Sequence, residues 1–463
     1  MDELDLARIQ FASTSIYHFF FVPVTIGLAF LVALLQTAWY RSGDHRHERL
    51  TRFFGTLLLI NVAIGVVTGL VQEFQFGMSW SAYSRFVGDV FGAPLAMEGL
   101  AAFFLESTFL GLWVFGWKVL SRRMHLLSVW MVAVGAMLSA AFIMAANSWM
   151  QHPVGYTTDP GTGRPELSSI TDLFTNPVFV WGYVHVVLAS LVTGGLVMLA
   201  VSAWQLRRGK EVFHTSAVLS IVVLVPASIL ALGVGSHLGV VEATYQPMKI
   251  AAAEAQWETC QPCSFSLFQI GGGRNDENPT QVLEVPHLLS ILATGTWNGK
   301  VVGLNELNQQ ENQKYGSGNY VPDVFIQYWS MRVMAYLGSL VAVLSLWGAW
   351  LAFRRRLDTS RLFLFLATWA VVTPFLMDSA GWLLTENGRQ PWIVQGLMTT
   401  ADGVSPSVSS TELVISLVAF LLVYAVLGLL DVVLMLRYGR RELDLEAVDE
   451  ELEGDTGVPA LTY

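Results

Sequence analysis

Long apolar stretches recur along the chain and are separated by charged or Gly/Pro-rich junctions. An α-helix needs about 20 mainly apolar residues to cross the hydrocarbon core of a bilayer. Nine stretches reach this length, so the pattern predicts an all-α membrane protein with nine transmembrane helices. The expected spans are residues 15–39, 53–76, 94–117, 124–147, 177–204, 215–236, 323–352, 362–385 and 411–436.

Basic residues are concentrated at every second junction between these spans. Most of the 26 Lys and Arg residues lie there: Arg41, Arg46, Arg49, Arg52, Lys118, Arg122, Arg123, Arg207, Arg208, Lys210, Arg354, Arg355, Arg356, Arg361, Arg437, Arg440 and Arg441. Short cytoplasmic loops carry an excess of Lys and Arg. The alternation therefore predicts an N-terminus outside and a C-terminus in the cytoplasm. The acidic leader MDELDLAR also argues against a cleavable signal in the first span.

Four regions follow from this pattern. Residues 1–236 hold the first six helices, residues 237–322 form a long outer segment, residues 323–437 hold the last three helices, and residues 438–463 form an acidic cytoplasmic tail. Within the outer segment, residues 247–259 are typical of a short amphipathic helix and residues 271–279 of a flexible turn.

The two cysteines, Cys260 and Cys263, both lie in the outer segment. Disulfides form in oxidising compartments, so a bridge is permitted there, with two free thiols as the alternative. A metal site is not favoured, because two further ligands of suitable type are not nearby in sequence.

Composition agrees with a chain embedded in a lipid bilayer. It is 53% hydrophobic and only 13% charged, where an ordinary soluble domain carries about 25% charged residues. The mean hydropathy is +0.51. A net charge of −10 argues against a nucleic-acid partner.

A few ionisable residues interrupt the apolar spans, and each is costly in hydrocarbon and therefore a candidate for function. They are His18, Glu98, Glu106, His185, Arg332, Asp378 and Glu386. A lone buried histidine is more often a hydrogen-bonded core residue than a ligand. The predicted orientation, however, places five of the seven in the outer half of the membrane. Glu106 lies about 12 Å deeper than Glu98, at 1.5 Å per residue, on nearly the same helix side.

Haem is the cofactor class that best explains isolated His, Met and Glu side chains in apolar helices rich in aromatic residues. Haem iron accepts His, Met or oxygen ligands, and Arg side chains can neutralise the propionates. Met334 lies two residues from Arg332, which suits an axial ligand beside a propionate partner.

Five segments, in the same order along the chain, resemble the haem-bearing subunit I of cytochrome bd-type quinol oxidases. The most specific is GWLLTENGRQPW (381–392), which is similar to the family signature G-W-x-x-x-E-x-G-R-Q-P-W. The others are FASTSIYHFFFVP (11–23), GAPLAMEGLAAFFLEST (92–108), KIAAAEAQWET (249–259) and YWSMRVM (328–334). The resemblance covers essentially the whole chain.

The resemblance implies two b-type haems and one d-type haem. His185 and Met334 would be the axial ligands of a low-spin b haem that takes electrons from quinol. His18 and Glu386 would serve the high-spin b haem and the d haem, and which residue binds which haem is left open.

The remaining implied roles concern protons and propionates. Glu98 would lie at the oxygen-reducing site as a further ligand. Glu106, together with Ser107 and Ser139, would carry protons from the cytoplasm. The propionates would be held, and the haems packed, by Arg332, Trp382 and Arg389.

The outer segment is of the compact kind, without the long insertion of some family members. The resemblance implies that Lys249 and Glu254 bind quinol there, menaquinol or ubiquinol, with Glu254 accepting a proton. It also implies O2 as the electron acceptor, a second haem-free membrane subunit, and a place in the bacterial cytoplasmic membrane. The implied reaction separates charge without pumping. Small accessory subunits are left open.

Three rival functions require other residue patterns. A haem-copper oxidase needs six histidine ligands and a bis-His dihaem cytochrome b needs four, whereas only His18 and His185 lie deep in a predicted span. The remaining alternative is a proton-coupled transporter using Glu98, Glu106 and Asp378. Transporters usually place their site at the midplane between internal repeats, and no repeat is visible here.

Overall fold

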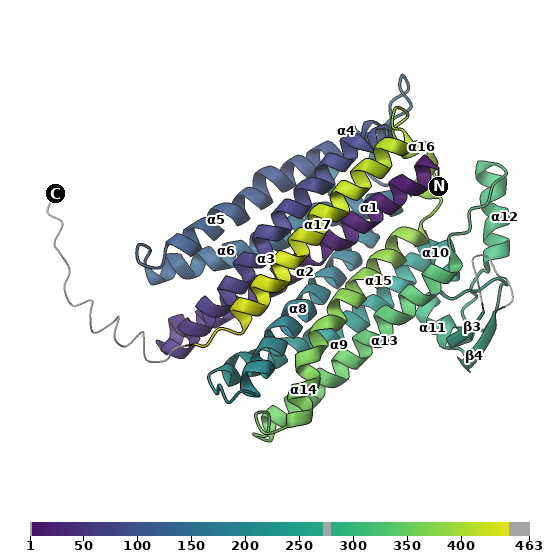
Figure 1. Cartoon of the computed structure of the whole chain (residues 1–463). Coiled ribbons are helices and arrows are strands. Elements are labelled where there is room, and N and C mark those ends of the chain that lie inside the picture. The colour runs from purple at the N-terminus through teal and green to yellow at the C-terminus, as the bar shows by residue number, and fades with distance from the viewer. Residues whose placement is uncertain (1, 272–278, 444–463) are drawn as a thin grey trace, which may run out of the picture.

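The structure is a computed structural model, and it describes residues 2–271 and 279–443. Within these residues, nine helical spans are long and apolar enough to cross a membrane, which confirms the predicted number. The spans form one elongated bundle (Figure 1). The predicted turn at 271–279 and the acidic tail at 438–463 fall largely outside the described residues.

Six spans are single α-helices and three are built from consecutive pieces. The single helices are α3 (His45–Met78), α6 (Arg122–Gln151), α8 (Pro177–Leu206), α9 (Phe213–Tyr245), α13 (Val324–Phe353) and α17 (Ser410–Gly439). The composite spans are α1 (Glu3–Phe19) with α2 (Phe21–Ser42); α4 (Ser81–Met97), η1 (Glu98–Phe103) and α5 (Phe104–Phe115); and α14 (Arg361–Trp369), η2 (Ala370–Val372) and α15 (Thr373–Gly388).

Four spans are clearly longer than the hydropathy pattern predicted. The first begins at Glu3 rather than near residue 15, the second at His45 rather than near 53, and the third at Ser81 rather than near 94. The sixth continues to Tyr245 rather than ending near 236. Hydropathy detects only the part of a helix that sits in hydrocarbon, and polar turns outside it remain helical. The extension of α9 brings His237 and Glu242 into the helix.

The composite spans change winding near proline residues and near site residues. Pro23 has no N–H to donate to the carbonyl of Phe19, and the first span breaks at Phe20, two residues after His18. Pro374 follows the 3₁₀ turn η2 in the same way. The third span contains a π turn, η1, which begins at Glu98. Such turns occur frequently at functional sites.

The centre of the bundle is packed through glycine. A Cβ added to Gly27 on α2 would lie 2.2 Å from the Ser190 carbonyl oxygen on α8, and one added to Gly194 would lie 2.4 Å from the Gly27 carbonyl carbon. Small residues allow membrane helices to approach this closely, which gives van der Waals packing in place of a hydrophobic driving force.

Short elements gather at one end of the bundle, which we call the loop end, together with the N-terminus (Figure 1). The opposite end, which carries the Arg- and Lys-rich junctions, is the basic end. The short elements are antiparallel strand pairs β1–β2 (Tyr156–Thr158, Pro165–Leu167), β3–β4 (Phe265–Ile270, Thr280–Val285) and β5–β6 (Trp392–Val394, Met398–Thr399), with helices α7 (Ile170–Thr175), α10 (Pro247–Ala253), α11 (Leu288–Thr294), α12 (Leu304–Tyr315) and α16 (Thr400–Gly403).

The segment between α9 and α13 is folded rather than irregular. Helix α10 is shorter than the predicted 247–259 helix and ends at Ala253. Cys260 and Cys263 form a disulfide with an S–S distance of 1.99 Å, the first of the two alternatives. Cys260 also pairs with Val301 through two backbone hydrogen bonds of 3.1 Å, which ties the loop together.

Candidate functional site

His18 lies at the last turn of α1 and faces α3. Its Nδ1 is 2.9 Å from the Thr68 hydroxyl. A Cβ on the neighbouring Gly69 would lie 3.1 Å from the ring carbon Cε1, so the absence of a side chain there makes room for the imidazole. The break at Phe20 sets where this ring projects from the first span.

His185 on α8 and Met334 on α13 also lie against glycines. A Cβ on Gly235 would lie 2.9 Å from Cε1 of His185, and one on Gly381 would lie 3.2 Å from the Met334 sulfur. Nδ1 of His185 is buried and, among the described residues, makes no hydrogen bond of ordinary geometry. Trp382, next to Gly381, stacks on Phe19 with ring centroids 5.1 Å apart.

Glu98 is the first residue of the π turn η1, and Glu106 lies in the first turn of α5, three residues after η1 ends. Glu98 accepts a hydrogen bond of 2.6 Å from Ser139, and it interacts electrostatically with Glu106. In a continuous α-helix, eight residues would rotate the two carboxylates by about 80°. A π turn rotates less per residue about the helix axis than an α-helix does, because each hydrogen bond spans one more residue. The smaller rotation brings the Glu98 and Glu106 side chains toward the same side of the span.

The two serines that were predicted to accompany Glu106 on the proton path have different hydrogen-bond partners. Ser139 pairs with Glu98 rather than with Glu106. Ser107 is exposed and donates to the Phe104 carbonyl at 3.4 Å. The backbone of Glu106 instead packs against Gly135 on α6, where an added Cβ would lie 2.9 Å from its nitrogen.

Glu386, near the end of α15, is held by two neighbours. Asn147 on α6 donates to its Oε1 at 2.9 Å, and the Arg389 guanidinium pairs with its other oxygen. Arg389 is buried and also donates to the Ile393 carbonyl at 2.7 Å. This Glu–Arg pair is part of the segment that carries the most specific motif.

A directed chain of hydrogen bonds runs from Glu386 to the outer segment. The Gln151 side-chain amide donates to the side-chain oxygen Oδ1 of Asn147 at 2.9 Å. Its own side-chain oxygen accepts a hydrogen bond from Lys249 on α10, and Lys249 also pairs with Glu242 at 2.8 Å. Each hydrogen bond in this series is donated in the direction of Glu386, from Lys249 to Gln151, from Gln151 to Asn147 and from Asn147 to Glu386. The series therefore links the Lys249 ammonium to the Glu386 carboxylate.

Glu254 and Arg332 form a second buried pair between the outer segment and α13. The Arg332 Nη2 donates to Glu254 at 2.7 Å and to the Ser266 carbonyl at 2.7 Å, while Nη1 donates to the Ala253 carbonyl at 2.5 Å. Burial raises the pKa of Glu254, and the Arg332 charge acts against that rise. Arg332 thus binds the loop; within the described chain only its Nε lacks a hydrogen bond.

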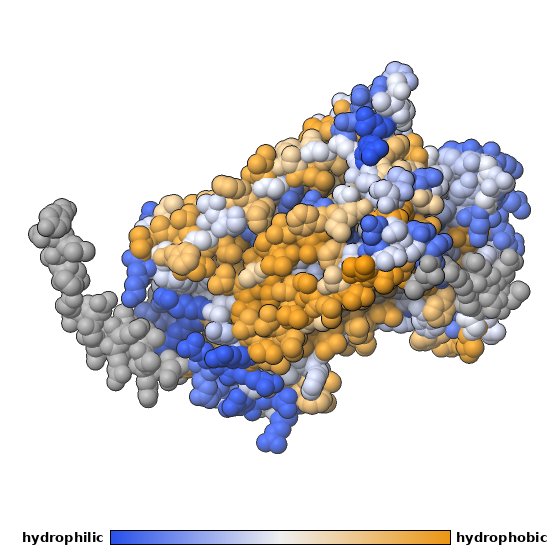
Figure 2. Space-filling view, turned by 45° about the horizontal axis from the view of Figure 1, so that its top comes forward, coloured by the Kyte–Doolittle hydropathy of each residue, from blue (hydrophilic) through white to orange (hydrophobic). Residues whose placement is uncertain are grey.

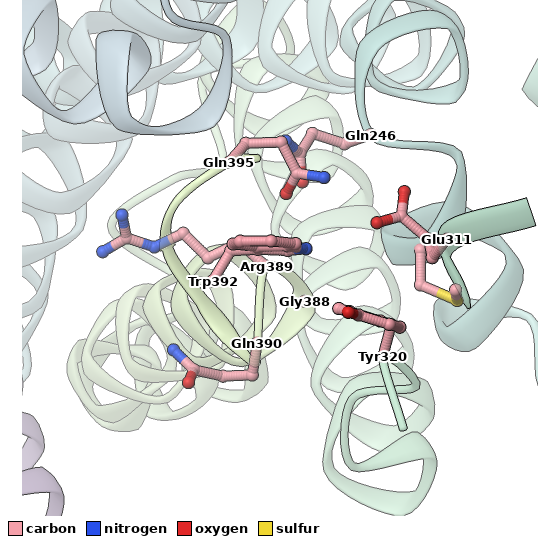
Figure 3. Close-up of a pocket in the computed structure, with 9 residues that line it drawn as sticks. Gln246, Glu311, Tyr320, Gly388, Arg389, Gln390, Trp392 and Gln395 are labelled. Carbon is pink, nitrogen blue, oxygen red and sulfur yellow. The ribbon is translucent and has the colours of Figure 1, made fainter. Parts of the chain in front are cut away.

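A cavity of about 10 Å³ lies beside Arg389 of the Glu386–Arg389 pair (Figure 3). Its walls are Gln246, Met248, Glu311, Tyr320, Gly388, Arg389, Gln390, Trp392 and Gln395. The Glu311 carboxylate points into it, and the Tyr320 and Trp392 rings stack with centroids 5.6 Å apart. Burial raises the pKa of Glu311. The volume suits about one water molecule rather than a substrate.

Asp378, the remaining predicted residue, is buried and accepts a hydrogen bond of 3.3 Å from Thr193 on α8. Sequence reasoning missed Glu73 on α3 and Asp431 on α17, although a charged residue inside an apolar stretch was a signal in both cases. Glu73 interacts electrostatically with Glu98. Asn147 and Gln151 were also missed, since an uncharged amide in a helix carries little signal.

The chain is similar over nearly its whole length to known proteins. The family model described as "Cytochrome bd terminal oxidase subunit I" matches residues 6–443. "Cytochrome bd ubiquinol oxidase subunit 1" of Bacillus subtilis is 44% identical, covering 94% of this chain and 93% of the relative. "Cytochrome bd-II ubiquinol oxidase subunit 1" of Escherichia coli is 38% identical, with 95% and 96% covered.

A solved structure agrees with these relatives. The bd oxidase from Geobacillus thermodenitrificans superposes with a TM-score of 0.86 at 30% identity, covering 96% of this chain and 99% of the other. The fold and site therefore define a multi-pass subunit of a respiratory terminal oxidase. The chain belongs to the cytochrome bd terminal oxidase subunit I family. As such it is a quinol:oxygen oxidoreductase subunit that works with a subunit II, and this replaces the transporter alternative.

The residues present fit haem groups. His18, His185 and Met334 each lie beside a glycine that leaves space at the ligand atom or ring. Within the part of the chain described here, the buried Nε1 of Trp382 has no hydrogen-bond partner, and the buried Nδ1 of His185 has none of ordinary geometry. Buried polar atoms are normally paired, so unpaired ones indicate a missing partner.

Proposed function

We propose that this subunit binds two b-type haems and one d-type haem and couples quinol oxidation at the loop end to reduction of O2 to water. When bound, the haems supply electron transfer and oxygen chemistry. His185 and Met334 would hold the low-spin b haem, and His18 and Glu386 would serve the other two, with Glu98 beside the oxygen-reducing site. Trp382 and Arg389 would pack and neutralise them.

The observation that carries this proposal is the Glu254–Arg332 pair, two residues before Met334 on α13. Arg332 thereby holds the carboxylate of Glu254, which lies just after α10, against the same helix that carries the haem-ligand candidate Met334. Glu254 would take a proton from quinol, because its burial favours the protonated form. Lys249, held by Glu242 and Gln151, would orient the quinol oxygen.

We further propose that the loop end faces outside and the basic end faces the cytoplasm of a bacterial cell, following the positive-inside rule. Quinol protons would then be released outside. Protons for water formation would come from the cytoplasm through Glu106, which lies closer to the basic end than Glu98 does. Charge would be separated across the membrane without a pumping step.

Optical spectra of the complex, purified with its second subunit from haem-sufficient cells, test the proposal. Low-spin b-type bands and a far-red chlorin band are expected. Replacement of His185 should remove the low-spin b-type bands, and replacement of His18 or Glu386 should perturb the far-red chlorin band. A purified complex without haem absorbance would overturn the proposal.

A further inference from the structure

The β3–β4 hairpin exposes apolar side chains on both of its faces. Ile270 is 69% exposed and Leu283 is 64% exposed, with Phe268 and Val285 also exposed. The antiparallel register pairs Phe268 with Val282, and side chains alternate between faces along a strand. Phe268 and Ile270 therefore lie on one face, and Leu283 and Val285 on the other.

The hairpin lies along the side of α13 rather than beyond its end. The Ser266 carbonyl accepts from Arg332, and one turn further the Leu267 carbonyl accepts from the Tyr336 hydroxyl at 2.5 Å. The Phe268 ring is 5.8 Å from that of Tyr336. Tyr336 is twelve residues into α13, which is about 18 Å along its axis from the loop end.

This position coincides with one edge of the hydrocarbon core. Arg354, Arg355 and Arg356 mark the other edge, at the basic end of α13. About 20 helical residues cross the core, and counting back from Phe353 places the edge at the loop end near Met334. Strand β3 therefore lies at the depth where headgroups meet acyl chains. Figure 2 shows hydrophobic side chains at the lower edge of the lobe on the right.

We propose that the β3–β4 hairpin is an interfacial anchor whose apolar side chains insert into the bilayer leaflet at the loop end. Lipid can surround a wedge that is apolar on both faces, whereas a docked protein would cover one face. Val333 and Leu340 on α13 are also exposed, and helical spacing places them on the same side of the helix as Tyr336, which contacts the hairpin. The open edges of a two-stranded hairpin are tolerated at the boundary but not deep in hydrocarbon. Exposed Glu284 also requires headgroup depth.

The anchor has a consequence that rests on the proposed function. Ser266 on β3 binds Arg332, and Arg332 binds Glu254. Insertion of the hairpin therefore fixes the predicted quinol site at the depth of the lipid headgroups. A lipophilic quinol moving within the bilayer would reach Glu254 without leaving the leaflet.

Depth-dependent quenching tests the anchor in the complete oxidase complex. Leu283→Cys and Ile270→Cys, one on each face, are labelled with an environment-sensitive fluorophore. The complexes are reconstituted in phosphatidylcholine–phosphatidylglycerol vesicles. The quenchers are a phosphatidylcholine with a nitroxide on carbon 5 of the acyl chain, and aqueous iodide. Gln309→Cys on the polar surface of α12 is the matched control, and the unsubstituted complex gives the background.

The nitroxide lipid is expected to quench both hairpin labels strongly and iodide to quench them weakly, with the reverse at position 309. Iodide quenching equal to that at 309 would place the hairpin in water and overturn the proposal. Protection of either hairpin label from both quenchers would show a protein covering that face and would also overturn it. Unchanged optical spectra confirm folding. Because quenching does not depend on turnover, this result is separable from the oxidase proposal.

Discussion

Two buried histidines, at opposite ends of the bundle, show how a structural residue differs from a ligand. His125 lies in the first turn of α6 at the basic end, and both ring nitrogens are engaged: Nδ1 is 2.7 Å from the Gln36 amide nitrogen, and Nε2 is 2.9 Å from the Trp113 carbonyl oxygen. His185 lies in the loop-end half, and its buried Nδ1 makes no ordinary hydrogen bond to any described residue. Full pairing marks a core histidine, whereas an unpaired nitrogen beside a glycine marks a site for a group from outside the chain.

The largest expected effect comes from replacing each histidine by alanine. His185→Ala should abolish the low-spin b-haem bands and reduce quinol oxidase activity to background, because an axial ligand is lost. His125→Ala should retain all haem bands and lower the free energy of unfolding by about 1–3 kcal/mol, the cost of leaving buried partners unpaired. Optical spectra and thermal unfolding of both complexes measure this. Equal haem loss in the two variants would show that His185 does not differ from the structural residue His125 in its role toward haem.

Arg332→Met should be the next most severe change, because it leaves Glu254 buried without its cation. Breaking a buried ion pair in this way costs about 3–5 kcal/mol. Arg332 acts to lower the pKa of Glu254, so its removal should raise that pKa further. If Glu254 must be deprotonated to accept a proton, the acid limb of the activity profile should move to higher pH. The measurement is the rate of quinol oxidation as a function of pH. An acid limb at the same pH as in the unsubstituted complex, or at lower pH, would contradict the prediction.

Gly235→Ala should have a smaller, local effect on the His185 site. The added Cβ would lie 2.9 Å from the ring carbon Cε1, so the ring must shift. We expect the low-spin b-haem bands to shift while the haem is kept. Gly233→Ala, on the same helix with nothing within 4 Å of its added Cβ, is the matched control and should leave the spectrum unchanged. Identical spectra for the two variants would indicate that Gly235 has no role in placing His185.

Gln151→Leu should give the smallest effect, because Lys249 keeps its partner Glu242. The substitution removes the link between Lys249 and Asn147, so the KM for quinol should rise severalfold with little change in kcat. Gln205→Leu, at a buried glutamine whose amide binds the Gly439 carbonyl at the basic end, is the control for a general packing effect. A similar KM change in both variants would argue against a specific role of the hydrogen bonds that join Lys249, Gln151 and Asn147.

Parts of the site could be predicted because their signals are local. Charged or ligand-type residues inside apolar stretches single out His18, His185 and Glu98, and the motif around Glu386 is contiguous. The pairing of Arg332 with Glu254 could not be predicted, because 78 residues separate them and the loop fold brings them together. The π turn was missed, since hydropathy does not respond to a change of helical winding.

The nine spans can be read from the amino-acid pattern alone, because the cost of placing polar backbone and side chains in hydrocarbon acts on each segment separately. Which polar groups meet depends instead on the packing of the folded chain. Gln151 joins Lys249 to Asn147 from a helix end that no pattern marked, and the hairpin lies beside α13 because Tyr336 and Arg332 bind its backbone. Such contacts depend on how helices and loops pack together, so they are not encoded in the properties of any one segment.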